Sequence, residues 1–459
     1  MRFSPRPYQE LIIEAICKTP RVAIWASMGM GKTVATLTAL DYILSVEGGK
    51  ALVIAPLRVA QSTWPVEAKK WEHLSSLKVV CVCGSAKERE AKLAESADVY
   101  CTNFENIPWL VERYGRAWPF DVIVVDEATR LKGFRLRQGS KRARALGRVA
   151  HLFCRRFVEL TGTPAPNGLL DLWGQAWFLD HGERLGKSIS EYQARYFRPY
   201  RVGSEAYMVE WIPNPGADGL VRDRLKDLTL TVNAEDYFPV DKPIETFLGV
   251  DLPDSVFEGY RELERDFFTE LESGEEVEAV NAGVKLGKCL QYASGAIYTD
   301  EHRNWTEVHR AKMDALKSVI EEAAGAPVLV AYQYQHEAQR ILLDIPNARL
   351  LDKNPQTIAD WNAGKIPVLV AHPASCGHGL NLQDGGNILV FTSVGYNYEA
   401  YAQIIERIGP TRQAQSGHPR PVFIYYITAN CTVDSDVLRA LREKEDVMNF
   451  ILGKRRDLS

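Results

Sequence analysis

The sequence lacks a hydrophobic run long enough to cross a bilayer, since no stretch approaches the roughly 20 apolar residues that a spanning helix needs. The first residues, from Met1 to Arg6, also lack the apolar segment of a secretory signal peptide. We therefore expect no membrane association and a protein that stays inside a cell.

Cysteine is sparse, with eight residues among 459 and no spacing typical of a metal site or a disulfide framework. The closest pair, Cys81 and Cys83, lies in an apolar run without nearby histidine or cysteine partners. We interpret these side chains as buried free thiols in a reducing compartment. Short-period repeats and low-complexity linkers are lacking as well, so a chain of this length predicts two or three ordinary compact domains.

Excess positive charge is also missing, because the net charge is −4 and the isoelectric point is near 6.2. The charge is unevenly distributed, however, since every charged side chain in residues 130–156 is basic. These side chains are Arg130, Lys132, Arg135, Arg137, Lys141, Arg142, Arg144, Arg148, Arg155 and Arg156. The run predicts a local patch that faces phosphates, with a solvated helix face as the alternative.

Apolar strand-like runs alternate with helical stretches in the first 180 residues and again after residue 313, a pattern typical of parallel sheets covered by helices. Predicted strands lie at residues 21–26, 51–55, 79–82, 98–102, 122–125 and 157–160, and then at 328–332, 348–351, 368–371, 388–391 and 422–426. The sequence between them is aromatic-rich and reads as helical or irregular. The predicted fold is α/β, with lobes at residues 1–172 and 314–459 joined by a helical insertion and connector at 173–313.

A glycine-rich segment follows the first predicted strand and precedes a helical run at residues 34–44. This setting is typical of a phosphate-binding loop, in which glycines let backbone N–H groups approach phosphate oxygens. Lys32 would reach the β- and γ-phosphates of ATP, and the Thr33 hydroxyl would bind Mg²⁺. The predicted ATP-binding residues of this segment are Ser27, Met28, Gly29, Met30, Gly31, Lys32 and Thr33.

Two adjacent carboxylates, Asp126 and Glu127, end the predicted strand at residues 122–125. Buried strand ends rarely carry two acids unless these bind something cationic. Asp126 would hold Mg²⁺, and Glu127 would polarise the water that attacks the γ-phosphate. Taken alone, the pair could cap the next helix, but the phosphate-binding loop favours the catalytic interpretation.

These segments resemble the superfamily two helicases, and among them the Swi/Snf-type DNA translocases, in which Asp-Glu-Ala-His precedes a basic stretch. Thr129 stands where that family has histidine, which puts the strength of coupling in question. The resemblance continues in residues 53–58 with Trp64, Glu67 and Trp71 behind them, and in residues 102–105, 160–164, 328–332, 375–383 and 403–413. It covers nearly the whole chain and is closest to compact phage-encoded Swi/Snf-like DEAD/DEAH-box helicases.

The resemblance implies two RecA-like P-loop lobes that use ATP and Mg²⁺, with Gln9 at the adenine-reading position. It implies nucleic-acid contacts at Pro56, Leu57, Arg58, Thr102, Asn103, Gly377 and Gly379, to which the basic run adds Arg135, Arg137 and Arg142. It further implies that Thr161, Gly162 and Thr163 couple hydrolysis to movement.

The last motif departs from the family, because Pro410 stands where the second arginine is expected. We predict a helix over residues 397–407, capped by Asn397 and ended by the Gly-Pro pair at 409–410. Gln403 and Arg407 would share one face of this helix toward the nucleotide. Arg412 would lie on the following loop as a displaced second finger.

The implied function is ATP-driven translocation on double-stranded DNA without sequence preference, by a monomer located in the host cytoplasm if a phage encodes it. Any targeting partner would be a separate protein. The alternatives are an RNA or single-strand unwinding helicase, and a non-catalytic DNA-binding clamp on a degenerate ATPase fold. The aromatic side chains of the connector would stack on bases or form a helical core, and the core is favoured; they include Trp177, Tyr192, Tyr196, Phe197 and Tyr200.

Overall fold

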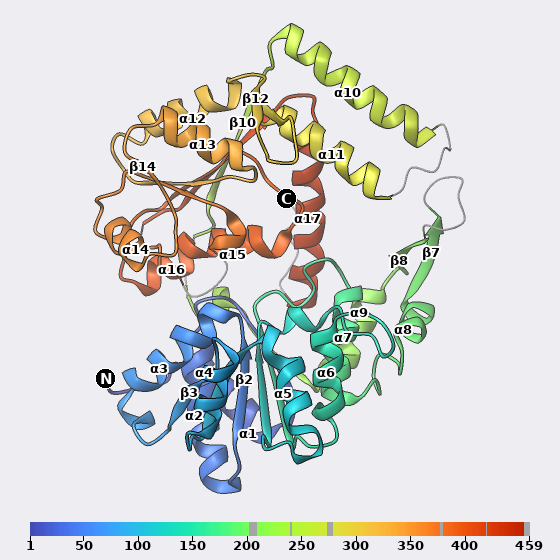
Figure 1. Cartoon of the computed structure of the whole chain (residues 1–459), viewed down its shortest axis with the longest axis vertical. Coiled ribbons are helices and arrows are strands. Elements are labelled where there is room, and N and C mark those ends of the chain that lie inside the picture. Colours follow the sequence, from blue (N-terminus) through green and yellow to red (C-terminus); the bar gives the residue numbers. More distant parts are fainter. Residues whose placement is uncertain (202–208, 239–240, 273–278, 377–379, 419, 454–459) are drawn as a thin grey trace. The chain divides into compact units, whose positions relative to one another are not determined.

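The computed structural model describes residues 1–201, 209–238, 241–272, 279–376, 380–418 and 420–453, and Figure 1 labels many of its elements. The chain divides into two compact units. Unit 1 contains Met1–Arg198, Trp211–Tyr237 and Lys444–Ser459, and unit 2 contains Pro199–Glu210 and Phe238–Glu443. Each unit therefore combines segments that are far apart in the sequence.

Unit 1 is built on a parallel sheet whose described strands have the order β3-β4-β2-β5-β6-β1-β9. The strands are β1 (Arg21–Ala26), β2 (Ala51–Ala55), β3 (Val79–Cys81), β4 (Val99–Asn103), β5 (Val122–Asp126), β6 (Arg156–Thr161) and β9 (Thr229–Val232). The apolar runs of β1, β2, β4 and β5 are buried nearly throughout, as expected for strands of a parallel sheet with both faces covered. Because the strands are parallel, their carboxyl ends share one edge, where ligands usually bind in such sheets.

The helices of unit 1 confirm the predicted alternation of strand and helix. They are α1 (Pro7–Lys18), α2 (Lys32–Glu47), α3 (Trp64–Lys70), α4 (Ala86–Ala94), α5 (Ile107–Tyr114), α6 (Lys141–Ala150), α7 (Leu170–Asp180), α8 (Ile189–Tyr196) and α9 (Ala217–Leu225). Helix α6 is strongly two-sided, because it buries Leu146 and Val149 while Lys141 and Arg148 stay exposed. Part of the basic run therefore forms the outer face of one helix.

Unit 2 contains a second parallel sheet, in which the described strands have the order β10-β17-β16-β13-β15-β14. Its strands are β10 (Ile244–Val250), β13 (Val328–Ala331), β14 (Ala348–Leu350), β15 (Val368–Ala371), β16 (Ile388–Phe391) and β17 (Phe423–Ala429). Its helices are α10 (Asp254–Glu272), α11 (Ala279–Ala293), α12 (Ala311–Glu322), α13 (Gln335–Asp344), α14 (Pro355–Asn362), α15 (Tyr398–Ile408) and α16 (Pro410–Gln415). A small hairpin of β11 (Ala296–Tyr298) and β12 (Trp305–Glu307) completes the described elements, and α17 (Asp434–Ile451) has residues in both units. The predicted fold class, two α/β lobes with parallel sheets and a helical insertion, is confirmed.

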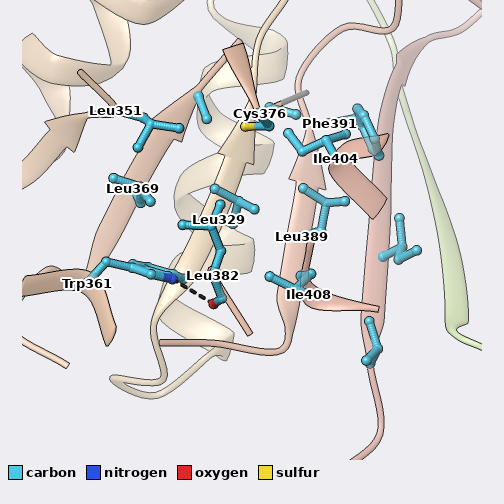
Figure 2. Packing of buried hydrophobic residues seen from close by; sticks show 14 of the residues in the cluster. Leu329, Leu351, Trp361, Leu369, Cys376, Leu382, Leu389, Phe391, Ile404 and Ile408 are labelled. Atoms are coloured by element: carbon cyan, nitrogen blue, oxygen red, sulfur yellow. Dashed lines mark hydrogen bonds between the residues drawn. The ribbon is translucent and has the colours of Figure 1, made fainter. Parts of the chain in front are cut away.

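The two faces of the second sheet carry separate cores because side chains alternate along each strand. Leu329 of β13 points to the face covered by α14 and α15, where Trp361, Ile404 and Ile408 pack, as Figure 2 shows. The neighbouring Val330 belongs to the opposite core, under α12 and α13. The Trp361 indole also donates a hydrogen bond of 2.8 Å to the Leu382 carbonyl, which fixes the loop before β16.

Two strands of the large sheets were not predicted by the sequence, which favoured helical and irregular structure between residues 173 and 313. Strand β9 adds to the edge of the first sheet beside β1, and β10 adds to the edge of the second sheet beside β17. Both pair in parallel with strands that are distant in the sequence, so no local pattern specifies their partners. The prediction for this segment was wrong at these two strands.

The connector aromatics are mostly core residues, as favoured from the sequence. Trp177, Tyr192, Tyr196 and Phe197 are buried, whereas Tyr200 is exposed. Phe197 begins a hairpin formed by β7 (Phe197–Arg201) and β8 (Val209–Pro213). Among the residues that the structure describes, none of the helices is both long and apolar enough to span a membrane.

Candidate nucleotide site and nucleic-acid contacts

The predicted phosphate-binding loop connects β1 to α2 at the carboxyl edge of the first sheet. Gly29 and Gly31 have φ values of 80° and 69°, the left-handed region in which glycine is unstrained. The Lys32 ammonium donates to the Ala26 carbonyl at 2.7 Å and to the Ser27 carbonyl at 3.3 Å. Gly29, Gly31 and Lys32 thus give the loop the conformation of a phosphate-binding loop.

Gln9 of α1 lies directly against this loop. Its side chain is buried, and its Oε1 accepts a 2.9 Å hydrogen bond from the Arg6 backbone N–H. A Cβ atom added to Gly31 would collide with Gln9 Nε2. The structure therefore brings the predicted adenine-reading residue and the loop together.

The strand that the sequence did not predict supports the loop from its other side. The Ser27 backbone N–H donates to the Val232 carbonyl of β9 at 3.1 Å, and the Ser27 hydroxyl accepts from the Ala234 backbone N–H at 3.2 Å. These contacts hold the start of the loop at both its backbone and its side chain.

The two predicted acids follow β5 on the same edge of the sheet. Asp126 is the last residue of that strand, and its Oδ2 accepts a 3.0 Å hydrogen bond from the Trp64 indole. Glu127 has a φ of 63° and a ψ of 59°, a left-handed conformation that is uncommon for residues other than glycine. Strained backbone of this kind clusters at functional sites, where surrounding structure holds it in place.

The third predicted motif, after β6, lies against the phosphate-binding loop. A Cβ atom added to Gly162 would lie 3.3 Å from Met28 Cγ and 3.4 Å from the Ala26 carbonyl oxygen. The Thr161 hydroxyl accepts a 3.0 Å hydrogen bond from the Thr163 backbone N–H. Thr129 is fully buried, and its hydroxyl has no hydrogen-bond partner among the described residues.

The predicted nucleic-acid contacts of unit 1 divide into exposed and internal groups. Leu57 and Arg58 are exposed after β2, whereas Pro56 is buried. Thr102 and Asn103 are buried at the end of β4. The Thr102 hydroxyl donates to the Val82 carbonyl at 2.8 Å, and the Asn103 amide donates to a Glu105 oxygen at 2.7 Å. Their side chains thus organise the protein itself.

The basic run does not form one continuous surface. Arg155 and Arg156 pair with Glu47, and Arg155 also with Asp121, at the amino end of β6. That end is opposite to the edge that carries Asp126. The single patch predicted over residues 130–156 therefore needs correction, because parallel strands place the start and the end of the run on opposite sheet edges.

The three arginines predicted to contact nucleic acid lie in the first part of this run. Arg135 donates to the Lys132 and Phe134 carbonyls and sits over the Trp173 ring, while Arg142 pairs with Glu105 at 2.5 Å. Arg137 is exposed on the loop before α6.

In unit 2, the predicted helix of the last motif is present as α15. The Asn397 side chain caps it by accepting a 3.2 Å hydrogen bond from the Ala400 backbone N–H. Gln403 and Arg407 are both buried, with 3% and 4% of their surface exposed. Arg407 donates to the Leu380 carbonyl at 3.4 Å.

Arg412 does not lie on a loop, contrary to the prediction. Pro410 ends α15 as expected but also begins α16, because a proline fits the first position of a helix. Arg412 is therefore helical, and it donates to Asn381 Oδ1 at 3.4 Å. Burial lowers the pKa of the Arg412 guanidinium from its ordinary value.

Sequence reasoning missed Arg420, which holds the same loop as Arg407 and Arg412. Its guanidinium donates to the Gln383 carbonyl at 2.9 Å and to Gln413 Oε1 at 3.0 Å. It follows the last motif without any pattern that marks it. Gly377 and Gly379 lie outside the described residues, so the structure says nothing of these predicted contacts.

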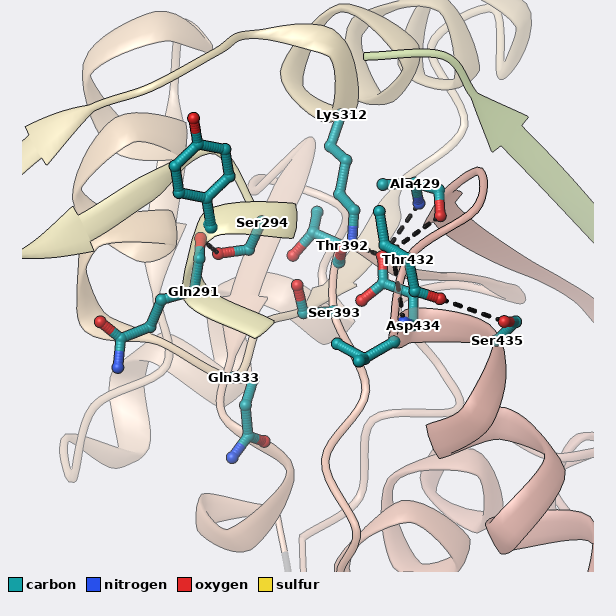
Figure 3. Close-up of polar contacts among 12 residues, drawn as sticks. Gln291, Ser294, Lys312, Gln333, Thr392, Ser393, Ala429, Thr432, Asp434 and Ser435 are labelled. Carbon is teal, nitrogen blue, oxygen red and sulfur yellow. Dashed lines mark hydrogen bonds and ion pairs between the residues drawn. The ribbon is translucent and has the colours of Figure 1, made fainter. Parts of the chain in front are cut away.

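A buried polar network lies at the carboxyl ends of β16 and β17 in unit 2, as Figure 3 shows. The Lys312 ammonium lies 2.5 Å from Asp434 Oδ2 and donates to the Thr392 carbonyl at 3.1 Å. Asp434 also accepts from the Ala429 backbone N–H at 2.9 Å. With Lys312 3% exposed and Asp434 7% exposed, the pair is almost fully removed from water.

The residues predicted to bind magnesium fit that ion chemically. Thr33 and Asp126 offer a hydroxyl and a carboxylate, and Mg²⁺ usually takes one or two such oxygens together with substrate phosphates. No group of three or more His, Cys, Asp or Glu side chains within the described part of the chain is arranged to hold a metal ion. Nucleotide phosphates and water would supply the remaining oxygens of such a site.

Comparison with known proteins is consistent with this site. Residues 23–225 match the SNF2-related domain, a span that includes Lys32, Asp126 and Glu127. The putative protein p41 of Acyrthosiphon pisum secondary endosymbiont phage 1 is 51% identical over 454 residues, which cover 98% of each chain.

Other known proteins are similar to parts of the chain, or to most of it at low sequence identity. Helicase SWR1 of Mycosarcoma maydis is 32% identical over 189 residues, which cover 39% of this chain and 10% of that protein. The Sulfolobus solfataricus SWI2/SNF2 ATPase core in complex with dsDNA matches with a TM-score of 0.44 and 19% identity, covering 98% of this chain and 92% of that one.

Proposed function

The chain belongs to the SNF2-related, Swi/Snf-like helicase family, and from this premise we propose that it hydrolyses ATP to translocate along double-stranded DNA. The observation that carries the proposal is the arrangement of three motifs at one sheet edge of unit 1. Gln9 and Gly162 both abut the phosphate-binding loop, and the Asp126-Glu127 pair ends the strand beside β6. This arrangement supports in-line attack on a nucleoside triphosphate.

Each residue has a role that follows from its chemistry. Lys32 offsets the charge of the β- and γ-phosphates, and the backbone N–H groups of the loop orient them. Magnesium, when bound through Thr33 and Asp126, supplies a further positive charge for the phosphate oxygens. Glu127 polarises the attacking water, and its backbone is left-handed directly after the end of β5.

We propose the DNA-binding surface from the family and from exposed residues of unit 1. Leu57 and Arg58 follow the carboxyl end of β2, and Arg137 lies exposed before α6. Contacts of this kind to phosphates are independent of sequence and weaken steeply with salt. We therefore expect a motor without sequence preference. We further propose that it acts as a monomer and that any targeting protein is supplied separately.

A triplex-displacement assay tests translocation directly. The wild-type protein with ATP should remove a third strand from a duplex without separating the duplex itself. Glu127→Gln should bind ATP and the duplex but leave the third strand in place, because an amide cannot polarise water as a carboxylate does. Strand separation of a forked substrate, or preference for RNA, would instead support the unwinding-helicase alternative.

The non-catalytic clamp remains the second candidate, because Arg407 and Arg412 contact their own loop in unit 2. A clamp would bind duplex DNA equally well with and without ATP. ATP-independent DNA binding together with no hydrolysis by the wild-type protein would favour the clamp and overturn the motor.

A further inference from the structure

Trp64 is fully buried, and its one polar atom is directed at a functional carboxylate. The indole Nε1 donates to Asp126 Oδ2 at 3.0 Å. A buried indole N–H normally finds a partner, but a backbone carbonyl would satisfy it equally well. Trp173 in the same unit has such a partner, because its Nε1 donates to the Gly186 carbonyl at 2.9 Å.

Trp64 is also joined to the exposed residues after β2 by continuous helical backbone. The π-helix at Val59–Thr63 begins directly after Arg58 and runs into α3, whose first residue is Trp64. π-helical turns are rare and frequently occur at functional sites. This backbone is the route by which contact at Arg58 could act on the indole that donates to Asp126.

We propose that Trp64 is a positioning residue that orients the Asp126 carboxylate for magnesium and links it to occupancy of the surface at Leu57 and Arg58. The proposal rests on the proposed ATPase function. Partners that orient a metal ligand from outside typically contribute about 10- to 100-fold to metal affinity. A merely structural tryptophan would not change how nucleotide binding depends on magnesium.

The test compares two conservative variants of the full chain. Trp64→Phe keeps most of the buried ring but removes the N–H donor, and Trp173→Phe makes the same change where the partner is a carbonyl. Affinity for a fluorescent, non-hydrolysable ATP analogue is measured with magnesium and with EDTA. Thermal unfolding of each variant is recorded alongside, so that a folding defect is recognised.

The magnesium-dependent gain in affinity should fall about 10- to 100-fold in Trp64→Phe and should stay at the wild-type value in Trp173→Phe. Duplex DNA should lower the magnesium concentration needed for half-maximal binding in wild type, and Trp64→Phe should lose this effect.

An unchanged magnesium dependence in Trp64→Phe would overturn the proposal, as would an equal loss with magnesium and with EDTA. An equal DNA effect in wild type and variant would overturn the link to the surface. A wild-type protein that binds no magnesium nucleotide would overturn the proposed function itself, and this outcome is distinct from the three above.

Discussion

In unit 1, the lysine of the phosphate-binding loop lies at the carboxyl edge of the sheet, whereas in unit 2 the arginines of the last motif lie against the loop that precedes β16. The Lys32 ammonium donates to the Ala26 and Ser27 carbonyls of the phosphate-binding loop. Arg407, Arg412 and Arg420 instead donate to the loop at residues 380–383. In both units protein oxygens hold the cations, so a phosphate would compete for them in each. The units differ in the left-handed glycines of the unit 1 loop, Gly29 and Gly31, which shape that loop for phosphate.

The largest effect should follow from breaking the site of unit 1. Lys32→Ala removes the ammonium that would pair with phosphate, so turnover should fall by more than about 10³-fold. Steady-state ATP hydrolysis measures this loss. Lys50→Ala, at a lysine outside the site, should hydrolyse at the wild-type rate. Turnover of Lys32→Ala within tenfold of wild type would contradict the assignment of the loop.

The arginines of unit 2 sharpen the comparison. If Arg407 leaves the Leu380 carbonyl to reach phosphate, Arg407→Ala should lower single-turnover hydrolysis by about 10³-fold, and Arg412→Ala by about a tenth of that effect. Arg439→Ala on α17 serves as a control, because its partner Asp436 is exposed. Normal rates in both variants would mean that these arginines only hold the loop.

The predictability of the two units differs for physical reasons. Continuous apolar runs revealed the central strands, because burial on both faces requires such sequence. Strands β9 and β10 were not predicted, because their side chains are partly polar and the strands that they pair with are distant in the chain.

The candidate site was likewise predictable only where a local sequence pattern marked its residues. The order of motifs located Lys32 and Asp126, but sequence could not show that Trp64 donates to Asp126 or that Arg420 joins Gln413 to a loop. Those contacts depend on how separate elements pack. Pro410 was read correctly as a helix end, yet the same ring geometry also begins α16.

The stability of unit 2 should depend on its buried ion pair. Lys312→Met leaves Asp434 buried without its cation, so the free energy of unfolding should fall by about 3 to 5 kcal/mol. Urea unfolding of the full chain, monitored by hydrogen exchange of the unit 2 amides, measures the change in free energy. Lys317→Met on the same helix is the control, because its pair with Asp344 is more exposed and should contribute at most about 1 kcal/mol. Equal effects would show that the network carries no special stability.

The smallest effect concerns the divided basic run. Replacing Arg135, Arg137 and Arg142 with alanine should weaken duplex binding and flatten its salt dependence, by about one unit of slope for each phosphate that the protein no longer neutralises. Arg155→Ala, at the opposite sheet edge, should leave the slope unchanged. A flatter salt dependence in Arg155→Ala, or an unchanged salt dependence in the triple variant, would contradict the assignment of DNA contact to the first part of the run.

The central claim is tested most directly by steady-state ATP turnover of the wild-type protein without nucleic acid and with duplex DNA, single-stranded DNA and RNA. A motor that translocates on double-stranded DNA should hydrolyse ATP fastest with the duplex, independently of its sequence. Turnover that duplex DNA does not raise, or that single strands or RNA raise more, would contradict the account.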